Sequence, residues 1–287
     1  TTEIYTLSLH DALPICAGSE FHQHEGGLRE VGGRLPIVAV LALDNNSEPG
    51  LSMRVDLERL LRSQGFGSRA ECRALVARGR VAVDGQVCED SGAQFETEGF
   101  SFAVDNVVWN YRKLVYLALN KPAGYECSRR PVHHPSVYSL LPPPLVMRGV
   151  QAVGRLDQDT TGLLLLTDDG SFIHRYTSPR KLVPKIYEVI TRHPIDEAQR
   201  AALLGGVELH GESQLVAATA CTLLNERKLC LTVTQGKYHL VKRMVAAVGN
   251  RVAGLHRIAI GGFSLPVAMP LGQWMWLESP SGLGGSS

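Results

Sequence analysis

The chain has 287 residues, of which 44% are hydrophobic and 20% charged, a composition typical of a globular protein with one large or two modest domains. No apolar run approaches the roughly 20 residues of a membrane-spanning helix, so the composition argues against an integral membrane protein. The six cysteines include no C-x-x-C pair and are too sparse for a disulfide scaffold, which indicates a reduced, cytoplasmic location and no zinc site.

Charge is distributed unevenly along the chain. The formal net charge is +1, but residues 1–52 carry −5, which leaves +6 for residues 53–287. Residues 235–257 hold five lysines and arginines and no acidic residue. This balance suits contact with phosphates, and it equally suits a solvated basic surface.

The two ends of the chain are expected to lie outside the folded protein. The opening letters TTEIYTLSLHDALPI resemble translated sequencing-adapter sequence and lack the basic region of a signal peptide. We interpret residues 1–52 as a non-native or disordered leader, with a strand at Leu35–Leu43 as the alternative. Regular patterning begins at Met53, and residues 279–287 are expected to form a flexible tail.

Residues 53–111 are expected to form a small helical domain with a hairpin and a strand-like linker. Ser68 followed by Glu71 predicts a capping box at the start of a second helix. Asp84-Gly85 between two valine-rich runs predicts a tight hairpin turn. A first helix is predicted from the helical spacing of Val55, Leu57, Leu60 and Leu61.

The same segment is rich in arginine. Residues 53–83 hold seven arginines and three acidic residues, a local charge of +4 that suits a phosphate-contacting face. Two helices and a hairpin with the spelling G-x-x-S-R, then G-R-V-x-V-D-G, resemble the RNA-binding domain named after ribosomal protein S4. The alternative is a small helical domain with surface arginines. The candidate RNA contacts are Arg69, Arg73 and Arg80.

Residues 112–278 are strand-rich and are expected to form a second domain. Alternation over Val115–Leu119 predicts a strand that Pro122 ends, followed by an exposed loop over 121–144. The apolar run Leu163–Leu166 predicts a buried strand.

A carboxylate-rich loop precedes that buried strand. The segment 153–170 reads V-G-R-L-D-Q-D-T-T-G-L-L-L-L-T-D-D-G and places Asp157 on a loop next to a rigid element, a common position for a catalytic group. From the residues alone, Asp157 could equally be a turn residue that accepts hydrogen bonds from its own backbone.

The motif G-R-L-D-x-D-T-T-G resembles the catalytic motif of bacterial rRNA pseudouridine synthases. Later segments match the same family in order, including H-R-Y-T-S-P-R, K-I-Y-E-V and Q-G-K-Y-H-L-V-K-R-M, so the resemblance spans residues 53–278. The nearest branch modifies one uridine of 16S rRNA. The resemblance implies an α+β fold, in which a small S4-like domain precedes a catalytic domain with a mixed, mostly antiparallel sheet.

The resemblance also assigns roles to individual residues. Asp157 would be the catalytic aspartate that initiates cleavage of the glycosidic bond, Tyr187 would pack against the target base, and Lys242 would pair with Asp157. Arg155 would help to displace the base. The remaining assignments to substrate or RNA binding are Lys237, His239 and Arg243, with Arg257 as a further phosphate contact. One departure is Leu240, where family members usually carry Gln.

No metal or organic cofactor is implied, because uridine isomerisation is redox-neutral and the sequence lacks nucleotide-binding glycine motifs. The expected partner of this monomer is 16S rRNA or the assembling small ribosomal subunit. Three alternatives stay open: a synthase acting on 23S rRNA, a non-catalytic ribosome assembly factor, and a glycosidase that uses Asp157 and Asp159 as paired carboxylates.

Overall fold

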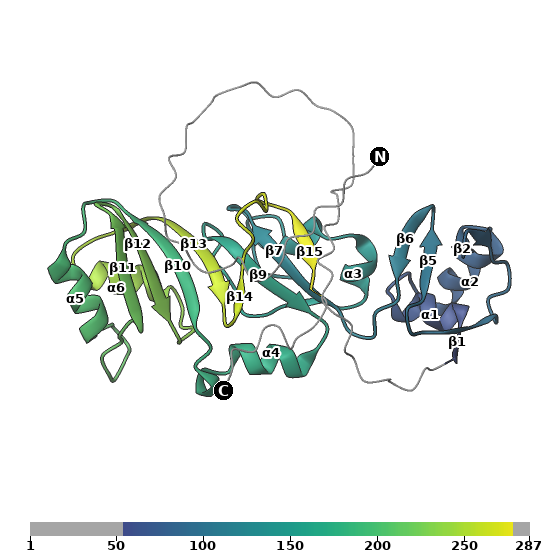
Figure 1. Cartoon of the computed structure of the whole chain (residues 1–287), viewed down its shortest axis with the longest axis horizontal. Coiled ribbons are helices and arrows are strands. Elements are labelled where there is room, and N and C mark those ends of the chain that lie inside the picture. The colour runs from purple at the N-terminus through teal and green to yellow at the C-terminus, as the bar shows by residue number, and fades with distance from the viewer. Residues whose placement is uncertain (1–53, 278–287) are drawn as a thin grey trace, which may run out of the picture.

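The computed structural model describes residues 54–277, so the predicted leader and tail lie outside the described residues. Figure 1 shows a small N-terminal body joined to a longer body built on a large sheet. The first body contains β1 (Arg54–Asp56), α1 (Leu57–Ser63), α2 (Arg69–Ala77), β2 (Val81–Val83), β3 (Gln86–Val87), β4 (Gln94–Glu96), β5 (Ser101–Val104) and β6 (Val107–Asn110).

The longer body mixes strands with short helices, which confirms the α+β prediction. Its elements are β7 (Tyr116–Lys121), a 3₁₀ turn (Val137–Leu140), α3 (Pro143–Met147), β8 (Gln151–Ala152), β9 (Thr161–Thr167), α4 (Gly170–Thr177), a second 3₁₀ turn (Pro179–Lys181), β10 (Lys185–Thr191), α5 (Glu197–Gly205), β11 (Ala220–Asn225), β12 (Lys228–Val233), α6 (Leu240–Ala247), β13 (Val252–Ile260), β14 (Phe263–Ser264) and β15 (Trp274–Trp276).

The N-terminal body packs two helices against antiparallel strands in the order β3-β2-β5-β6. The predicted capping box is present, since Ser68 and Glu71 exchange hydrogen bonds at the start of α2. Asp84 and Gly85 both have positive φ at the predicted turn between β2 and β3. Val55 was expected in the first helix but lies in β1, because its strand pairs with β4 far along the chain.

The longer body is organised around one sheet with the order β11-β12-β10-β13-β9-β7-β15. Its neighbouring strands are antiparallel except for β13 and β9, which confirms the mixed, mostly antiparallel prediction. The predicted strands are β7 and the central β9, where Leu163–Leu166 are all buried. The apolar side of α6 packs into a core shared with β10 and β12.

The segment 121–144 was expected to be an exposed loop, and this prediction is wrong at Lys121 and from Val137 onward. Val137 is fully buried, and Leu141 is 6% exposed. The chain turns back here, and a 3₁₀ turn and α3 place these side chains in the same core as Leu117 and Leu164 of the sheet. The middle of the segment is exposed at His133 and His134.

A narrow joint connects the two halves of the sheet. The parallel pairing of β13 with β9 covers only two residue pairs, His256 with Thr161 and Arg257 with Gly162. Gly162 has a φ of +101°, and a Cβ there would lie 2.3 Å from the carbonyl oxygen of Arg257. The close approach of the two backbones therefore requires glycine at this position.

We expect Gly162→Ala to lower the free energy of unfolding by about 3 kcal/mol or more, because it combines backbone strain with a clash against main-chain atoms. Gly85→Ala is the matched control: its φ is +76°, and a Cβ there would meet no atom within 4 Å. The control should lose only about 1–2 kcal/mol. Urea unfolding of both variants measures the difference, and equal losses would contradict the clash.

Candidate active site

A pocket of about 140 Å³ opens beside the sheet joint. Its wall is formed by the loop before β9, the starts of β10 and α6, and β13. Asp157 is the only carboxylate among the residues that line it, whereas Arg155, Lys185, Lys237 and Arg257 contribute cationic side chains. The surroundings of Asp157 are therefore strongly positive, which suits an anionic substrate.

A buried lysine holds the loop that carries Asp157. Lys121, the last residue of β7, is fully buried, and its Nζ donates to the carbonyl oxygens of Asp157 at 3.0 Å and Thr160 at 2.9 Å. It also donates to the carbonyl oxygens of Pro122 and Gln158. Burial lowers the pKa of Lys121. Lys121 was expected at the start of an exposed loop and is instead fully buried at the end of β7. The signal in the sequence is a lysine that directly continues the apolar alternation of this strand.

Lys242 is shared between two carboxylates. Its Nζ donates to Asp157 Oδ2 at 2.9 Å and to Asp159 Oδ1 at 2.7 Å. Burial lowers the pKa of Lys242, but the hydrogen bonds to Asp159 and Asp157 outweigh it and leave that pKa raised. Burial likewise raises the pKa of Asp159, but the hydrogen bond from Lys242, the charge of Lys242 and a backbone hydrogen bond together outweigh it and lower that pKa on balance. The expected pairing of Asp157 with Lys242 is present.

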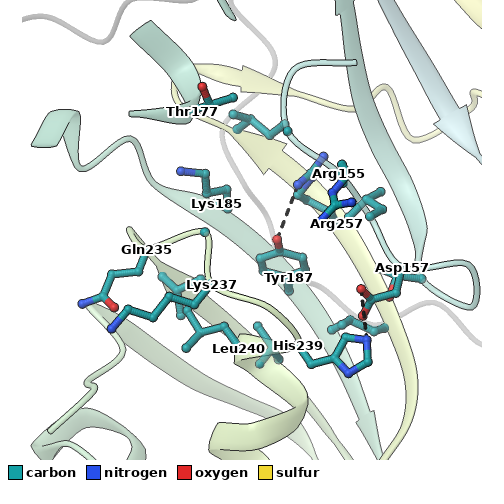
Figure 2. Close-up of a pocket in the computed structure, with 18 of the residues that line it drawn as sticks. Arg155, Asp157, Thr177, Lys185, Tyr187, Gln235, Lys237, His239, Leu240 and Arg257 are labelled. Carbon is teal, nitrogen blue, oxygen red and sulfur yellow. Dashed lines mark hydrogen bonds and ion pairs between the residues drawn. The ribbon is translucent and has the colours of Figure 1, made fainter. Parts of the chain in front are cut away.

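His239 lies on the other side of Asp157. Its Nε2 is 3.3 Å from Asp157 Oδ1, and its ring stacks on the exposed ring of Tyr238 at 3.7 Å between centroids. The backbone of His239 has a positive φ where it precedes α6. Figure 2 shows the His239 ring beside Asp157. The start of α6 therefore places two basic side chains, His239 and Lys242, next to one carboxylate.

Tyr187 comes from β10 and lines the same pocket as Asp157. Its hydroxyl accepts a hydrogen bond from Arg257 Nη1 at 3.5 Å, and Figure 2 shows the hydroxyl directed toward that guanidinium. The structure thus brings Asp157, Lys242 and Tyr187 together from three elements, with Lys242 outside the pocket wall but bonded to Asp157. One flat aromatic ring next to a carboxylate suits a planar ligand.

The remaining predicted contacts are placed differently. Arg155 is exposed at the pocket, and Lys237 and Arg243 both pair with Glu212. The prediction that Arg257 contacts phosphate is wrong, because its side chain is buried at the sheet joint and only 3% exposed. The three predicted arginines of the N-terminal body lie outside the pocket and form ion pairs: Arg69 and Arg73 with the buried carboxylate of Glu58, and Arg80 with the exposed Asp105.

We expect Lys242→Met to lower kcat by about 100-fold or more, because the charge that faces Asp157 is lost. Arg243→Met is the matched control on the adjacent helix position. The Arg243 side chain contacts Glu212 and the carbonyl oxygen of His210 instead of Asp157. We therefore expect its replacement to lower kcat by less than about tenfold. Single-turnover rates decide the comparison, and similar losses in the two variants would contradict the assignment.

Residues 54–277, the described part of the chain, show neither a metal-binding cluster nor a membrane-spanning helix. That part of the chain contains no group of three His, Cys, Asp or Glu side chains arranged to hold a metal. It contains no helix long and apolar enough to cross a membrane. The exposed His133 and His134 donate their backbone N–H groups to Glu126, which shapes their loop.

Comparison with known proteins shows which family combines this site with this fold. Residues 115–247 match the model described as RNA pseudouridylate synthase, and residues 57–98 match the S4 domain. A solved structure described as pseudouridylate synthase covers 78% of this chain and 96% of its own, with 32% identity and a TM-score of 0.55.

Three relatives match this chain over most of their own length. Ribosomal small subunit pseudouridine synthase A of Yersinia pestis is 39% identical over 206 residues, 70% of this chain and 87% of the relative. The Escherichia coli (strain K12) protein of that name is 37% identical over 218 residues, 76% of this chain and 94% of the relative. An uncharacterized RNA pseudouridine synthase of Bacillus subtilis is 37% identical over 221 residues, which cover 76% of this chain and 92% of the relative. The chain therefore belongs to the RNA pseudouridine synthase family and is an isomerase with an N-terminal S4 domain.

Proposed function

We propose that this enzyme converts one uridine of 16S rRNA, at position 516, to pseudouridine. The observation that carries the proposal is the joint placement of Asp157, Lys242 and Tyr187 at one cationic pocket. Two similar relatives are named for the small ribosomal subunit, which supports that substrate over 23S rRNA. We further propose that the enzyme is a monomer located in the cytoplasm. Its proposed partner is 16S rRNA or the assembling small subunit.

The proposed reaction begins with extrusion of the target uridine into the pocket. Extrusion costs a few kcal/mol, and stacking on Tyr187 recovers about 1–3 kcal/mol of it. Asp157 then initiates cleavage of the bond between ribose C1′ and uracil N1, by attack on the sugar or base or by removal of a sugar proton. The uracil rotates, its C5 bonds to C1′, the C5 proton leaves with help from Tyr187, and N1 gains a proton.

The electrostatics of the pocket support this chemistry. Lys242 Nζ donates to Asp157 Oδ2 at 2.9 Å and so holds the carboxylate in place for each of these routes. The cations Arg155 and Lys237 lie on the pocket wall, where a phosphodiester backbone would pass as the base enters. The reaction needs no oxidant, reductant or energy donor, because every bond that breaks is replaced within the same nucleotide.

The test is release of tritium from C5-labelled uridine by the full chain, with 16S rRNA, partly assembled small subunits and 23S rRNA as separate substrates. We expect release from a small-subunit substrate, with the modified position mapped to uridine 516. Release from 23S rRNA alone would move the proposal to the large subunit. Tight binding without release from any substrate would support the non-catalytic assembly factor instead.

The N-terminal body is proposed to anchor the RNA. Arg69 and Arg73 remain more than half exposed while they share the buried carboxylate of Glu58. We expect Arg69→Gln with Arg73→Gln to weaken rRNA binding about tenfold or more, and to make the slope of log K against log salt shallower by about 1–2. Filter binding at several salt concentrations measures both. An unchanged salt slope would show that these arginines do not contact phosphates.

A further inference from the structure

Arg257 is a buried cation that the proposed reaction does not use. Its side chain is only 3% exposed, although the residue lines the pocket. Its Nε donates to the carbonyl oxygen of Leu163 on β9 at 2.8 Å, and its Nη1 donates to Tyr187 Oη on β10 at 3.5 Å. The guanidinium therefore connects strands on both sides of β13, at the narrow joint of the sheet.

The second terminal nitrogen of Arg257 has no acceptor. Nη2 is one of five buried side-chain atoms in residues 54–277 that lack a hydrogen-bond partner. Three of the five belong to pocket-lining residues: Thr160, Gln235 and Arg257. A buried donor without a partner costs free energy, and such exceptions in folded proteins call for a specific explanation. Their concentration at this pocket indicates that a polar ligand completes it.

We propose that Arg257 recognises the extruded base, with Nη2 donating to a carbonyl oxygen of the uracil ring while Nη1 holds the hydroxyl of Tyr187. The inference rests on the proposed function. Uracil has two carbonyl oxygens, at C2 and C4. Cytosine carries an amino group at C4, and this group is a donor, so it cannot accept a hydrogen bond from a guanidinium. Donation to the oxygen at C4 would therefore favour uracil over cytosine, whereas donation to the oxygen at C2 would accept both bases; either bond would orient the ring against that of Tyr187.

Access to Nη2 requires a movement at the pocket. The atom is covered in the structure, and Arg155 lines the same pocket as Arg257. Arg155 is exposed and has no hydrogen-bond or ion-pair partner within the described part of the chain, so little holds its side chain in place. Displacement of Arg155 by the incoming base would uncover Arg257 and would separate two like charges.

The experiment combines substrate analogues with variants of the full chain. Small-subunit RNA is prepared with uridine, 2-thiouridine or 4-thiouridine at the target position, each labelled at C5, because sulfur is a poor hydrogen-bond acceptor. Single-turnover tritium release is measured for the parent, Arg257→Gln and Arg257→Lys. Lys185→Gln is the matched control, since Lys185 lines the same pocket but donates to the carbonyls of Val183 and Thr234.

With one of the two analogues we expect the parent to react about 10- to 100-fold more slowly than with uridine. This is the loss expected when a charge-assisted hydrogen bond is removed. The Arg257 variants should be slower on uridine but should lose less than threefold with that analogue, while Lys185→Gln keeps the parent ratio. Equal ratios in the parent and the Arg257 variants would overturn the proposal. If neither variant folds, a parent rate that is insensitive to both analogues overturns it as well. Failure of the proposed function is distinct, because the parent would then release no tritium from unmodified RNA.

Discussion

Asp157→Ala is expected to reduce tritium release by about 10⁴-fold or more while changing rRNA affinity less than threefold. The carboxylate is the group proposed to start bond cleavage, and loss of such a group removes transition-state stabilisation that neighbouring residues do not replace. Asp157 also pairs with Lys242, so its removal leaves that ammonium bonded to Asp159 alone. Single-turnover assays with saturating enzyme and filter binding separate chemistry from affinity.

Asp159→Asn is the matched control for this prediction. Asp159 accepts from the same Lys242 Nζ, but its side chain is 57% exposed and it does not line the pocket. We expect this variant to retain activity within about tenfold. A comparable loss in both variants would show that both carboxylates take part in the reaction, and would contradict the assignment of Asp157 alone as the group that starts bond cleavage.

Local signals in the sequence predicted local structure well. The capping box at Ser68 and the hairpin turn at Asp84-Gly85 depend on residues within a few positions of each other, and both are present. The buried strand at Leu163–Leu166 was equally clear, because a short run of leucines has few alternatives. In each case the residues that determine the local structure lie within the segment itself.

The wrong predictions share a dependence on distant partners. Val55 forms a strand because β4, about 40 positions later, pairs with it. The segment around Val137 is buried because it packs against a hydrophobic core formed by side chains of β7 and β9. Neither partner can be recognised from periodicity, since each is supplied by the tertiary fold.

The candidate site shows the same division. Asp157, Tyr187 and Lys242 were proposed from motif resemblance, and the structure brings them together. Arg257 was expected on the surface, because a basic residue in a basic segment is usually solvated. Its burial follows from its position on β13, which inserts between β10 and β9 and turns the side chain toward Leu163. Charge counts along the chain contain no information about that insertion.

Lys121→Met is expected to lower the free energy of unfolding by about 3–5 kcal/mol, a large part of the stability of a typical domain. Four carbonyl oxygens lie within 3.2 Å of its Nζ and would lose their donor at once. Three of them belong to the loop from Asp157 to Thr160, so the loop would also lose the tether that fixes the Asp157 carboxylate, the group proposed to be catalytic. We therefore expect kcat to fall by about 100-fold even in the fraction that stays folded.

Lys185→Met separates loss of a buried amine from loss of the loop tether. Lys185 also donates to main-chain carbonyls, and burial together with the nearby Arg257 lowers its pKa, but its acceptors lie outside the catalytic loop. We expect it to lose less stability than Lys121→Met, because it leaves two carbonyls without a donor instead of four. Urea unfolding and single-turnover rates at low temperature provide the comparison. If Lys121→Met unfolds at the parent's urea midpoint with an unchanged rate, the catalytic loop is held by its own turns and the buried ammonium is dispensable.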